Sequence, residues 1–260
     1  MGFKIKVRSK HESHEALRDQ MPSLPFKGVI RLGSTTSTSV VGEGFVECNT
    51  VEAIKNSACK RRMKTCFEDM GVITADWHNE VGMFGPEDYP IVAKHRLGSR
   101  GTGNYLLKTP ERAKELAKEK ANIGDFIFEK YHNFGREYRL YVTQHECYFA
   151  VRKLRKDGTE DKYRWRFRND DTHWVAETNP LFEKPSCWND MVSQGCLACK
   201  AVGLDISAVD VKVQQEHGAG KKTRFIILET NSAFTLHNKD LAATLKIVPI
   251  ILQRKYDAAH

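Results

Sequence analysis

The stretch Phe225-Ile-Ile-Leu-Glu-Thr-Asn-Ser-Ala-Phe234 decides how the rest of this chain is interpreted. It opens on a short apolar run with β-branched residues at its centre, which predicts a buried strand. The strand runs directly into Glu229 and Asn231. Because side chains alternate between the two faces of a strand, these two polar side chains project from the same face.

A second strand is predicted just upstream, over Ala208–Gln214. Asp210 and Lys212 share one face of it. The segment 215–223 between the two strands contains glycines and several charges, which is typical of a hairpin loop. If the strands pair antiparallel, Asp210 comes to lie beside the two polar residues of the downstream strand.

The two carboxylates of Asp210 and Glu229 and the amide oxygen of Asn231 form a ligand set that suits Mg²⁺ or Mn²⁺. A magnesium ion with so few protein ligands usually takes the others from water and phosphates. The pattern therefore predicts a nucleotide site as well as a metal site. The alternative is an ordinary hairpin with its acidic side chains in solvent, so the other motifs must decide.

Composition limits the class of protein. With 260 residues, 40% of them hydrophobic, the chain can bury a full core in one large domain or two smaller lobes. Its net charge of +8 favours an anionic partner. The cysteines, together with a charged N-terminus that does not resemble a signal peptide, indicate a reduced, cytoplasmic setting. No apolar run is long enough to cross a membrane, so no membrane partner is expected.

The first half of the chain has two informative segments. Residues 1–25 are weakly patterned and predict an irregular lead-in. Thr50 as an N-cap and Gly71 as a stop predict one helix between them. That helix carries a basic cluster, which is usually a solvated helix face: Lys60, Arg61, Arg62 and Lys64.

A glycine-rich loop over residues 98–103 separates the predicted strands Tyr89–Lys94 and Asn104–Lys108. Backbone amides can approach phosphate oxygens where no Cβ intervenes, so such a loop suits a phosphate lid. It is not a P-loop, since the G-K-[ST] ending and the following helix are missing.

The second half of the chain is mostly strands. They are predicted over Asp125–Tyr131, Arg136–Val142, Cys147–Leu154 and, with alternating basic and aromatic residues, 162–168. Helices follow over about 187–202 and 239–255. The first of these contains Cys196 and Cys199, which we interpret as buried helix-face thiols rather than a metal or redox site. This order predicts two α+β lobes rather than a doubly wound parallel sheet.

Read together, these motifs resemble the ATP-grasp superfamily. The ordered set is a helical lysine before "GVIT", then "YPIVAK", "GSRGTG", "FIFEKY", "GREYRLYV", "AVDVKV" and "ILETNSA", over roughly residues 50 to 240. The chain looks most like the short stand-alone members found in phage genomes, and more distantly like D-alanine–D-alanine and RimK-type ligases. The resemblance implies an α+β fold in which two lobes with antiparallel sheets grip ATP. The expected division is a reduced N-terminal segment 1–48, a first lobe 49–124 and a second lobe 125–260.

The resemblance also implies residue roles. Lys60 and Lys94 would reach the phosphates, and Glu137 would accept hydrogen bonds from the ribose. Two Mg²⁺ or Mn²⁺ ions would be held by Asp210, Glu229 and Asn231. The glycine-rich loop would close over the phosphates with Gly98, Ser99, Gly101, Thr102 and Gly103. A hinge whose backbone reads the adenine edge would consist of Glu129, Lys130 and Tyr131, with Lys130 near the adenine ring.

The implied reaction is carboxylate activation, in which the γ-phosphoryl group of ATP moves to a substrate carboxylate and an amine or similar nucleophile attacks the acylphosphate. Such chemistry needs positioning and charge neutralisation more than a protein nucleophile. The candidate cations are Arg139, Arg152, Lys153, Arg166 and Arg168, with Arg164 as a neighbour. Arg152 and Lys153 point to opposite faces of their strand, and the sequence leaves open which one faces the site.

Alternatives remain at this level. A kinase on the same scaffold could phosphorylate a hydroxyl of a polyanionic substrate, and a non-catalytic module could bind ATP and nucleic acid, although nucleic acid is not the favoured partner. Many family members have Pro–Gly where Phe234 and Thr235 stand here, which leaves the acceptor open. With a reduced N-terminal segment, we expect an acidic or carboxylate-bearing substrate that can be a peptide or a protein.

Overall fold

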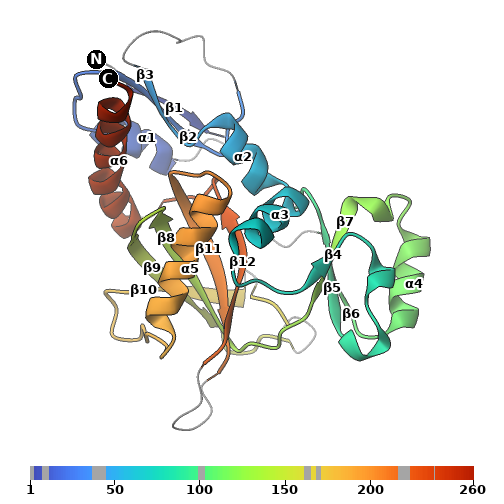
Figure 1. The fold of residues 1–260 in the computed structure, drawn as a ribbon. Helices are drawn as coiled ribbons and strands as arrows, with labels where there is room; N and C mark the ends of the chain where they lie inside the picture. The colour runs from blue at the N-terminus through green and yellow to red at the C-terminus, as the bar shows by residue number, and fades with distance from the viewer. Residues whose placement is uncertain are drawn as a thin grey trace.

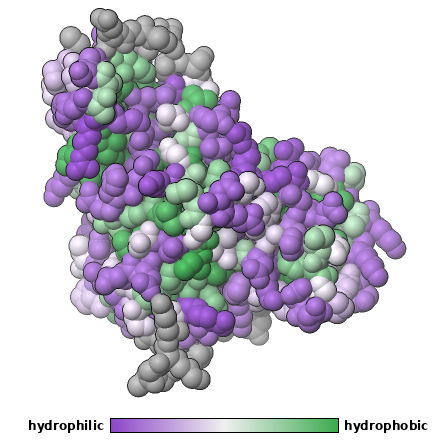
Figure 2. All heavy atoms as spheres, in the orientation of Figure 1, coloured by the Kyte–Doolittle hydropathy of each residue, from purple (hydrophilic) through white to green (hydrophobic). Residues whose placement is uncertain are grey.

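The computed structural model describes residues 3–7, 12–36, 45–98, 103–160, 165–167, 171–215, 223–236 and 238–260. Figure 1 shows a large body built around a central sheet, with a smaller lobe beside it. Within the described residues there are three sheets, of three, five and four strands. Hydrophilic residues cover most of the face seen in Figure 2, and none of the described helices is both long and apolar enough to span a bilayer.

The N-terminal segment is more regular than its weak pattern predicts. Its strands form a parallel sheet, with α1 (Glu12–Gln20) after the first strand: β1 (Phe3–Val7), β2 (Lys27–Leu32) and β3 (Phe45–Cys48). The C-terminal helix α6 (Asn238–Ala259) packs against this unit and buries Val248 and Leu252 beside Ile30. The pattern was weak because residues from the far end of the chain complete this core.

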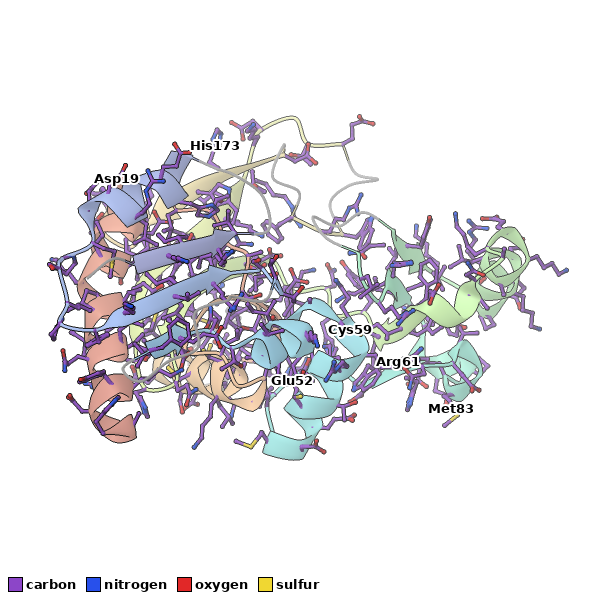
Figure 3. The ribbon with its side chains drawn as sticks, turned by 90° about the horizontal axis from the view of Figure 1, so that it is seen from above. Asp19, Glu52, Cys59, Arg61, Met83 and His173 are labelled. Atoms are coloured by element: carbon purple, nitrogen blue, oxygen red, sulfur yellow. The ribbon has the colours of Figure 1, made fainter. Side chains whose placement is uncertain are left out.

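The predicted helix between Thr50 and Gly71 is two helices, α2 (Val51–Ala58) and α3 (Lys60–Met70). Thr50 caps the first through its hydroxyl, and Gly71 ends the second in the left-handed conformation at φ 70°. The break falls at Cys59, which is extended, because the Lys60 N–H donates to the Arg96 carbonyl at 2.8 Å. A partner distant in sequence thus divides the helix. Figure 3 shows Cys59 between Glu52 of α2 and Arg61 of α3, at the junction of the two helices.

The small lobe is a four-stranded antiparallel sheet in the order β4-β7-β5-β6, next to α4 (Pro110–Glu119) and three short 3₁₀ helices. Its strands are β4 (Trp77–His78), β5 (Ile91–His95), β6 (Asn104–Leu107) and β7 (Phe126–Lys130). The expected lobe boundary at residue 125 therefore cuts through a sheet, since β7 pairs with β5. Helices α2 and α3 instead pack against the large body, where Ile54 and Phe67 join its core.

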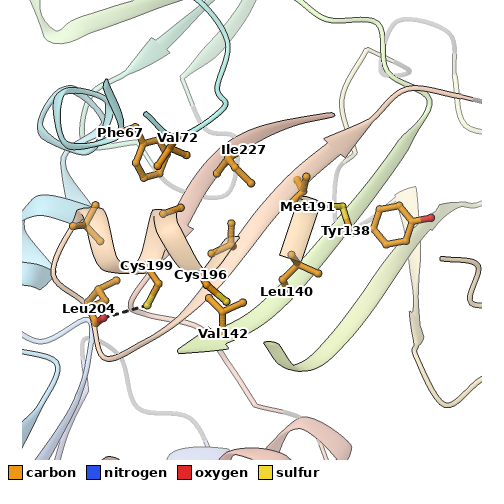
Figure 4. Packing of buried hydrophobic residues seen from close by; sticks show 14 of the residues in the cluster. Phe67, Val72, Tyr138, Leu140, Val142, Met191, Cys196, Cys199, Leu204 and Ile227 are labelled. Atoms are coloured by element: carbon orange, nitrogen blue, oxygen red, sulfur yellow. Dashed lines mark hydrogen bonds between the residues drawn. The ribbon is translucent and has the colours of Figure 1, made fainter. Parts of the chain in front are cut away.

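The central sheet is antiparallel throughout, in the order β10-β9-β8-β11-β12. Its strands are β8 (Arg136–Thr143), β9 (Cys147–Arg155), β10 (Thr172–Ala176), β11 (Ile206–Val213) and β12 (Phe225–Asn231). The helix α5 (Trp188–Ala201) covers one face, which Figure 4 shows with Leu140 and Val142 packed against it. Cys196 is buried in the core beneath α5, as the sequence predicted, and this burial raises the pKa of its thiol to about 11.

The basic strand predicted over 162–168 does not form in its described part, since Trp165–Phe167 is a turn and a bend. The edge strand is β10 instead, which pairs with β9 from Thr172↔Arg155 to Ala176↔Val151. An alternating pattern permits a strand, but pairing with a neighbour decides where the strand lies.

Candidate active site

The three predicted metal ligands converge on the open face of the central sheet. Asp210 on β11 is the direct cross-strand partner of Glu229 on β12. The amide Nδ2 of Asn231 lies 3.2 Å from Glu229 Oε1 and 3.4 Å from Asp210 Oδ2. A register shift between Asp210 and Val211 allows Ile227 to enter the core while Glu229 faces the site. The geometry predicted from period-two alternation is therefore present.

Arg139 on β8 lies on the other side of Asp210 and binds it with two hydrogen bonds. Its Nε is 2.8 Å from Oδ1 and its Nη2 is 2.9 Å from Oδ2. Burial alone would raise the pKa of Asp210, but the positive charges of Arg139 and Lys153 outweigh it and lower that pKa. The carboxylate of Asp210 therefore stays ionised, which is the form that binds a cation.

Trp174 on the edge strand β10 organises the two cations of this face. The guanidinium carbon of Arg139 and the ammonium of Lys153 each lie 4.8 Å from the centroid of its indole. Lys153 also makes a buried ion pair with Glu137 on β8, so the predicted ribose acceptor is already engaged by a lysine. An aromatic face that contacts two cations restricts the positions of both side chains.

Arg152 faces the other way, which resolves the choice that the sequence left open. Its guanidinium pairs with Glu183 at 2.6 Å and lies 5.9 Å from the ring of Tyr138, on the face that α5 covers. Lys153 is therefore the member of the pair on the site face, and Arg152 leaves the candidate set. Arg166 lies over Trp165, with its guanidinium carbon 5.0 Å from the ring centroid, and Arg168 is outside the described residues, as is Arg164.

Lys212 adds a further buried cation on this face. It is the cross-strand partner of Glu137, and its ammonium donates to the Trp165 carbonyl at 3.1 Å and lies 5.3 Å from the centroid of the Tyr131 ring. Burial lowers the pKa of Lys212 to about 8. The hydroxyl of Tyr131 also donates to the Trp165 carbonyl, at 3.3 Å, so the hinge and the segment around Trp165 meet at one point.

Lys60 lies between the glycine-rich loop and the metal-ligand candidates. Its ammonium donates to the Gly98 carbonyl and is 3.8 Å from Glu229 Oε2. Gly103 closes the far end of the loop at φ 75°, and its carbonyl accepts from the His95 N–H at 3.2 Å. The middle of the loop, including Ser99, Gly101 and Thr102, lies outside the described residues.

A second charged cluster lies where the small lobe meets the large body. Lys94 on β5 donates to Glu129 Oε2 on β7 at 2.6 Å, and Lys64 on α3 lies 3.3 Å from the other carboxylate oxygen. Burial would raise the pKa of Glu129, but the two ammonium groups outweigh it and lower that pKa to about 2. Burial lowers the pKa of Lys64 to about 8. The side chain of Glu129 thus binds two lysines, which the hinge assignment did not include.

Lys130, which the resemblance implies to lie near the adenine ring, forms an ion pair within the small lobe. Its ammonium pairs with Asp88 at 3.0 Å, and side-chain alternation along β7 turns it away from Glu129. The backbone N–H groups of Lys130 and Tyr131 donate to the carbonyls of Asp76 and Pro90 at 2.8 and 3.1 Å. These two donors of the hinge are therefore engaged within the protein.

Three residues of this site were not predicted as site residues: Lys64, Trp174 and Lys212. Lys64 stands four residues after Lys60, on the same helix face, and that spacing is a usable signal. Lys212 shares a strand face with Asp210, which is a second such signal. Trp174 gave none, because its strand was not predicted.

The donor set fits a divalent cation only in part. Within the described chain, no three His, Cys, Asp or Glu side chains are grouped so as to hold a metal ion. Asp210, Glu229 and Asn231 nevertheless lie within hydrogen-bond distance of one another, and all three can offer hard oxygen atoms once the Asn231 amide turns. Such a set fits magnesium that takes its other ligands from phosphates and water.

Among known proteins, this chain is similar to solved structures and matches neither a family model nor a curated sequence. Among solved structures, it is similar to D-alanine–D-alanine ligase from Bacillus anthracis, with a TM-score of 0.64, 10% identity and coverage of 100% of this chain and 98% of that one.

A second ligase, PsnB, shows the same likeness in two of its complexes. The ATP-grasp ligase PsnB, complexed with a phosphomimetic variant of a minimal precursor, Mg and ADP, matches with a TM-score of 0.61, 14% identity and coverage of 98% of both chains. A second PsnB structure, complexed with minimal precursor, matches with a TM-score of 0.50 and 20% identity. That match covers 74% of this chain and 57% of PsnB.

Carboxyaminoimidazole ribonucleotide synthase from Aspergillus clavatus, complexed with ATP, matches with a TM-score of 0.57, 16% identity and coverage of 81% of this chain and 54% of that one. The four matches place the same arrangement of sheets and helices in enzymes of different function. The fold that these matches share is the fold that the resemblance in the sequence implied. The chain therefore has the ATP-grasp fold.

Proposed function

We propose that this protein is an ATP-dependent ligase that activates a carboxylate as an acylphosphate for attack by an amine or similar nucleophile. The observation that carries the proposal is the convergence of Asp210, Glu229 and Asn231 beside Arg139 on the open face of the sheet. The fold shared with D-alanine–D-alanine ligase and PsnB supports this reaction class.

The proposed nucleotide lies between the small lobe and the central sheet. Asp210, Glu229 and Asn231 would hold Mg²⁺, and Lys60 and Lys94 would approach the phosphates. A bound divalent cation would neutralise phosphate charge during transfer. Glu137 accepts hydrogen bonds from the ribose hydroxyls, which replace part of its ion pair with Lys153.

In the proposed reaction, a substrate carboxylate oxygen attacks the γ-phosphorus and ADP leaves. The amine then attacks the acyl carbon, the bond to the phosphate oxygen breaks, and inorganic phosphate and a proton are released. Arg139 and Lys153 are the cations beside the metal-ligand candidates, and Trp174 restrains both. The chain thus supplies position and positive charge, which is what phosphoryl transfer needs.

The proposed substrate is an acidic group on a peptide or protein. PsnB, which shares the fold, is seen in complex with a precursor peptide. Phe234, which stands where many family members have proline, is buried against Tyr141 with ring centroids 5.7 Å apart. This part of the loop is filled by its own aromatic ring, which favours an acceptor that approaches from outside.

The test is Mg-ATP turnover, screened over amino acids, acidic peptides and polyanions. A ligase couples two substrates and releases phosphate, whereas a kinase leaves the phosphate on the acceptor, so product analysis separates them. Glu229→Ala is expected to lower kcat by on the order of 100-fold, the size seen when one transition-state contact is removed. Glu183→Ala, an ion-paired glutamate on the opposite face, is the matched control. Unchanged turnover in a folded Glu229→Ala preparation contradicts the proposal.

A further inference from the structure

Lys64 is a buried charge with no role in the proposed reaction. Its side chain is 0% exposed, and its ammonium contacts Glu129 Oε1 at 3.3 Å and donates to the hydroxyl of Thr74. The Thr74 hydroxyl in turn donates to the Ile227 carbonyl at 2.8 Å. A buried lysine is costly unless it is paired, so its presence calls for an explanation.

The charges of the cluster do not cancel. Lys64 and Lys94 each carry a positive charge and Glu129 carries one negative charge, which leaves one positive charge over the three side chains. Lys94 is the member nearer to solvent, with 14% of its side chain exposed, compared with 3% for Glu129. An anion that approaches the cluster from solvent therefore meets Lys94 first.

We propose that Lys64 is a positioning residue that neutralises Glu129, so that the charge of Lys94 remains available to nucleotide phosphates. This inference rests on the proposed function, since it assumes that ATP binds at Lys94. Without Lys64, Lys94 and Glu129 at 2.6 Å form a neutral pair that attracts a phosphate far less. Lys64 thus supplies the positive charge that balances Glu129.

The contacts of Lys64 also connect the two parts of the molecule. Lys64 lies on α3 and donates to the hydroxyl of Thr74, which lies in the segment after that helix. The Thr74 hydroxyl donates to the Ile227 carbonyl on β12, so both residues are attached to the large body. Glu129 and Lys94 belong to the sheet of the small lobe. The ion pair between Lys64 and Glu129 therefore holds the phosphate-side lysine at a defined place relative to the metal-ligand candidates.

The experiment is a charge-balance cycle that measures the Kd of Mg-ATP by calorimetry. Lys64→Met makes the cluster neutral, and we expect Kd to rise about tenfold, within the range of coupling between neighbouring charged groups. Glu129→Gln should bind at least as tightly as the wild type. The double variant Lys64→Met/Glu129→Gln keeps only the charge of Lys94, so its Kd should return to within about threefold of the wild type.

A purely structural role predicts the opposite for the double variant, because two lost contacts would then weaken binding further. If Lys64→Met alone does not fold, the double variant is compared with Glu129→Gln. Because Lys64 acts through the charge of Glu129, its removal should then change Kd by less than about threefold, and a loss of about tenfold overturns the inference. Lys55→Met on α2, whose side chain is 51% exposed, is the matched control. Wild-type affinity in Lys64→Met, or additive losses in the double variant, overturns the inference. No Mg-ATP binding by the wild type would instead count against the proposed function itself.

Discussion

At the scale of single residues, the site depends on groups that burial and charge act on in opposite directions. Glu129 is 3% exposed and would bind a proton readily if it stood alone, yet Lys64 and Lys94 keep it ionised. Asp210 shows the same balance, with Arg139 as the main compensating charge. Both carboxylates are therefore stable only while their cationic partners stay in place.

The titration of Glu129 has a measurable consequence for stability. Its pKa is lowered to about 2 in the folded protein, so its ion pairs stabilise the fold fully above pH about 4.5 and are lost as the pH falls toward 2. The loss is on the order of 3 kcal/mol. We expect the difference in unfolding free energy between wild type and Glu129→Gln to shrink as the pH falls from 7 to 3.5. Urea unfolding at several pH values measures this, and a constant difference contradicts it.

At the scale of elements, α5 packs closely against β8 at Gly195. A Cβ added at Gly195 would lie 3.0 Å from Cδ1 of Leu140, a side chain fully buried in the core. Helix propensity alone favours alanine over glycine by about 1 kcal/mol. Because the core around Leu140 is filled, we expect the steric term to dominate.

Gly195→Ala is therefore expected to lower the unfolding free energy by about 1–2 kcal/mol, the usual cost of overpacking a core. Chemical denaturation measures the change. Gly82→Ala is the matched control, since nothing lies within 4 Å of a Cβ added there. Stabilisation by Gly195→Ala would show that α5 can move away from the sheet at little cost.

The elements that could be predicted from the sequence are those whose signals are local. Period-two alternation around Asp210 and Glu229 gave the β11–β12 pair and its shared face, and Thr50 and Gly71 marked the ends of a helical stretch. The break at Cys59 could not be predicted, because Arg96 causes it from far along the chain. The place of β10 and the N-terminal sheet likewise depend on distant partners.

At the scale of the whole molecule, the two charged clusters belong to different bodies. Asp210, Glu229 and Arg139 lie on the central sheet, and Glu129 and Lys94 lie on the small sheet. A ligand that contacts both clusters would bind across the two sheets and would stabilise the folded state in proportion to its affinity. The resemblance to ATP-grasp proteins supplied the pairing of these clusters, which composition and periodicity alone could not.

Ligand binding should therefore raise the melting temperature in a metal-dependent way. At a concentration 100 times its Kd, a ligand adds about 2.7 kcal/mol to stability. Mg-ATP is expected to raise Tm by several degrees, and ATP with a chelator by clearly less, because Asp210 and Glu229 then face the phosphates without a cation between them. Equal shifts with and without Mg²⁺ would argue against the metal role of these residues.

The segment that follows α3 is hydrogen-bonded to β12 at Ile73 and Thr74 before it reaches the small lobe. The Ile227 N–H donates to the Ile73 carbonyl at 2.8 Å, and the Thr74 hydroxyl donates back to the Ile227 carbonyl at 2.8 Å. Two residues later, the Asp76 carbonyl accepts from Lys130 of the small sheet. Ala75 lies between these two attachments, and Ile227 is two strand positions from Glu229. A movement of the small lobe relative to β12 would therefore have to bend this connection at Ala75. The segment before Ala75 is therefore hydrogen-bonded directly to β12, the strand that carries Glu229.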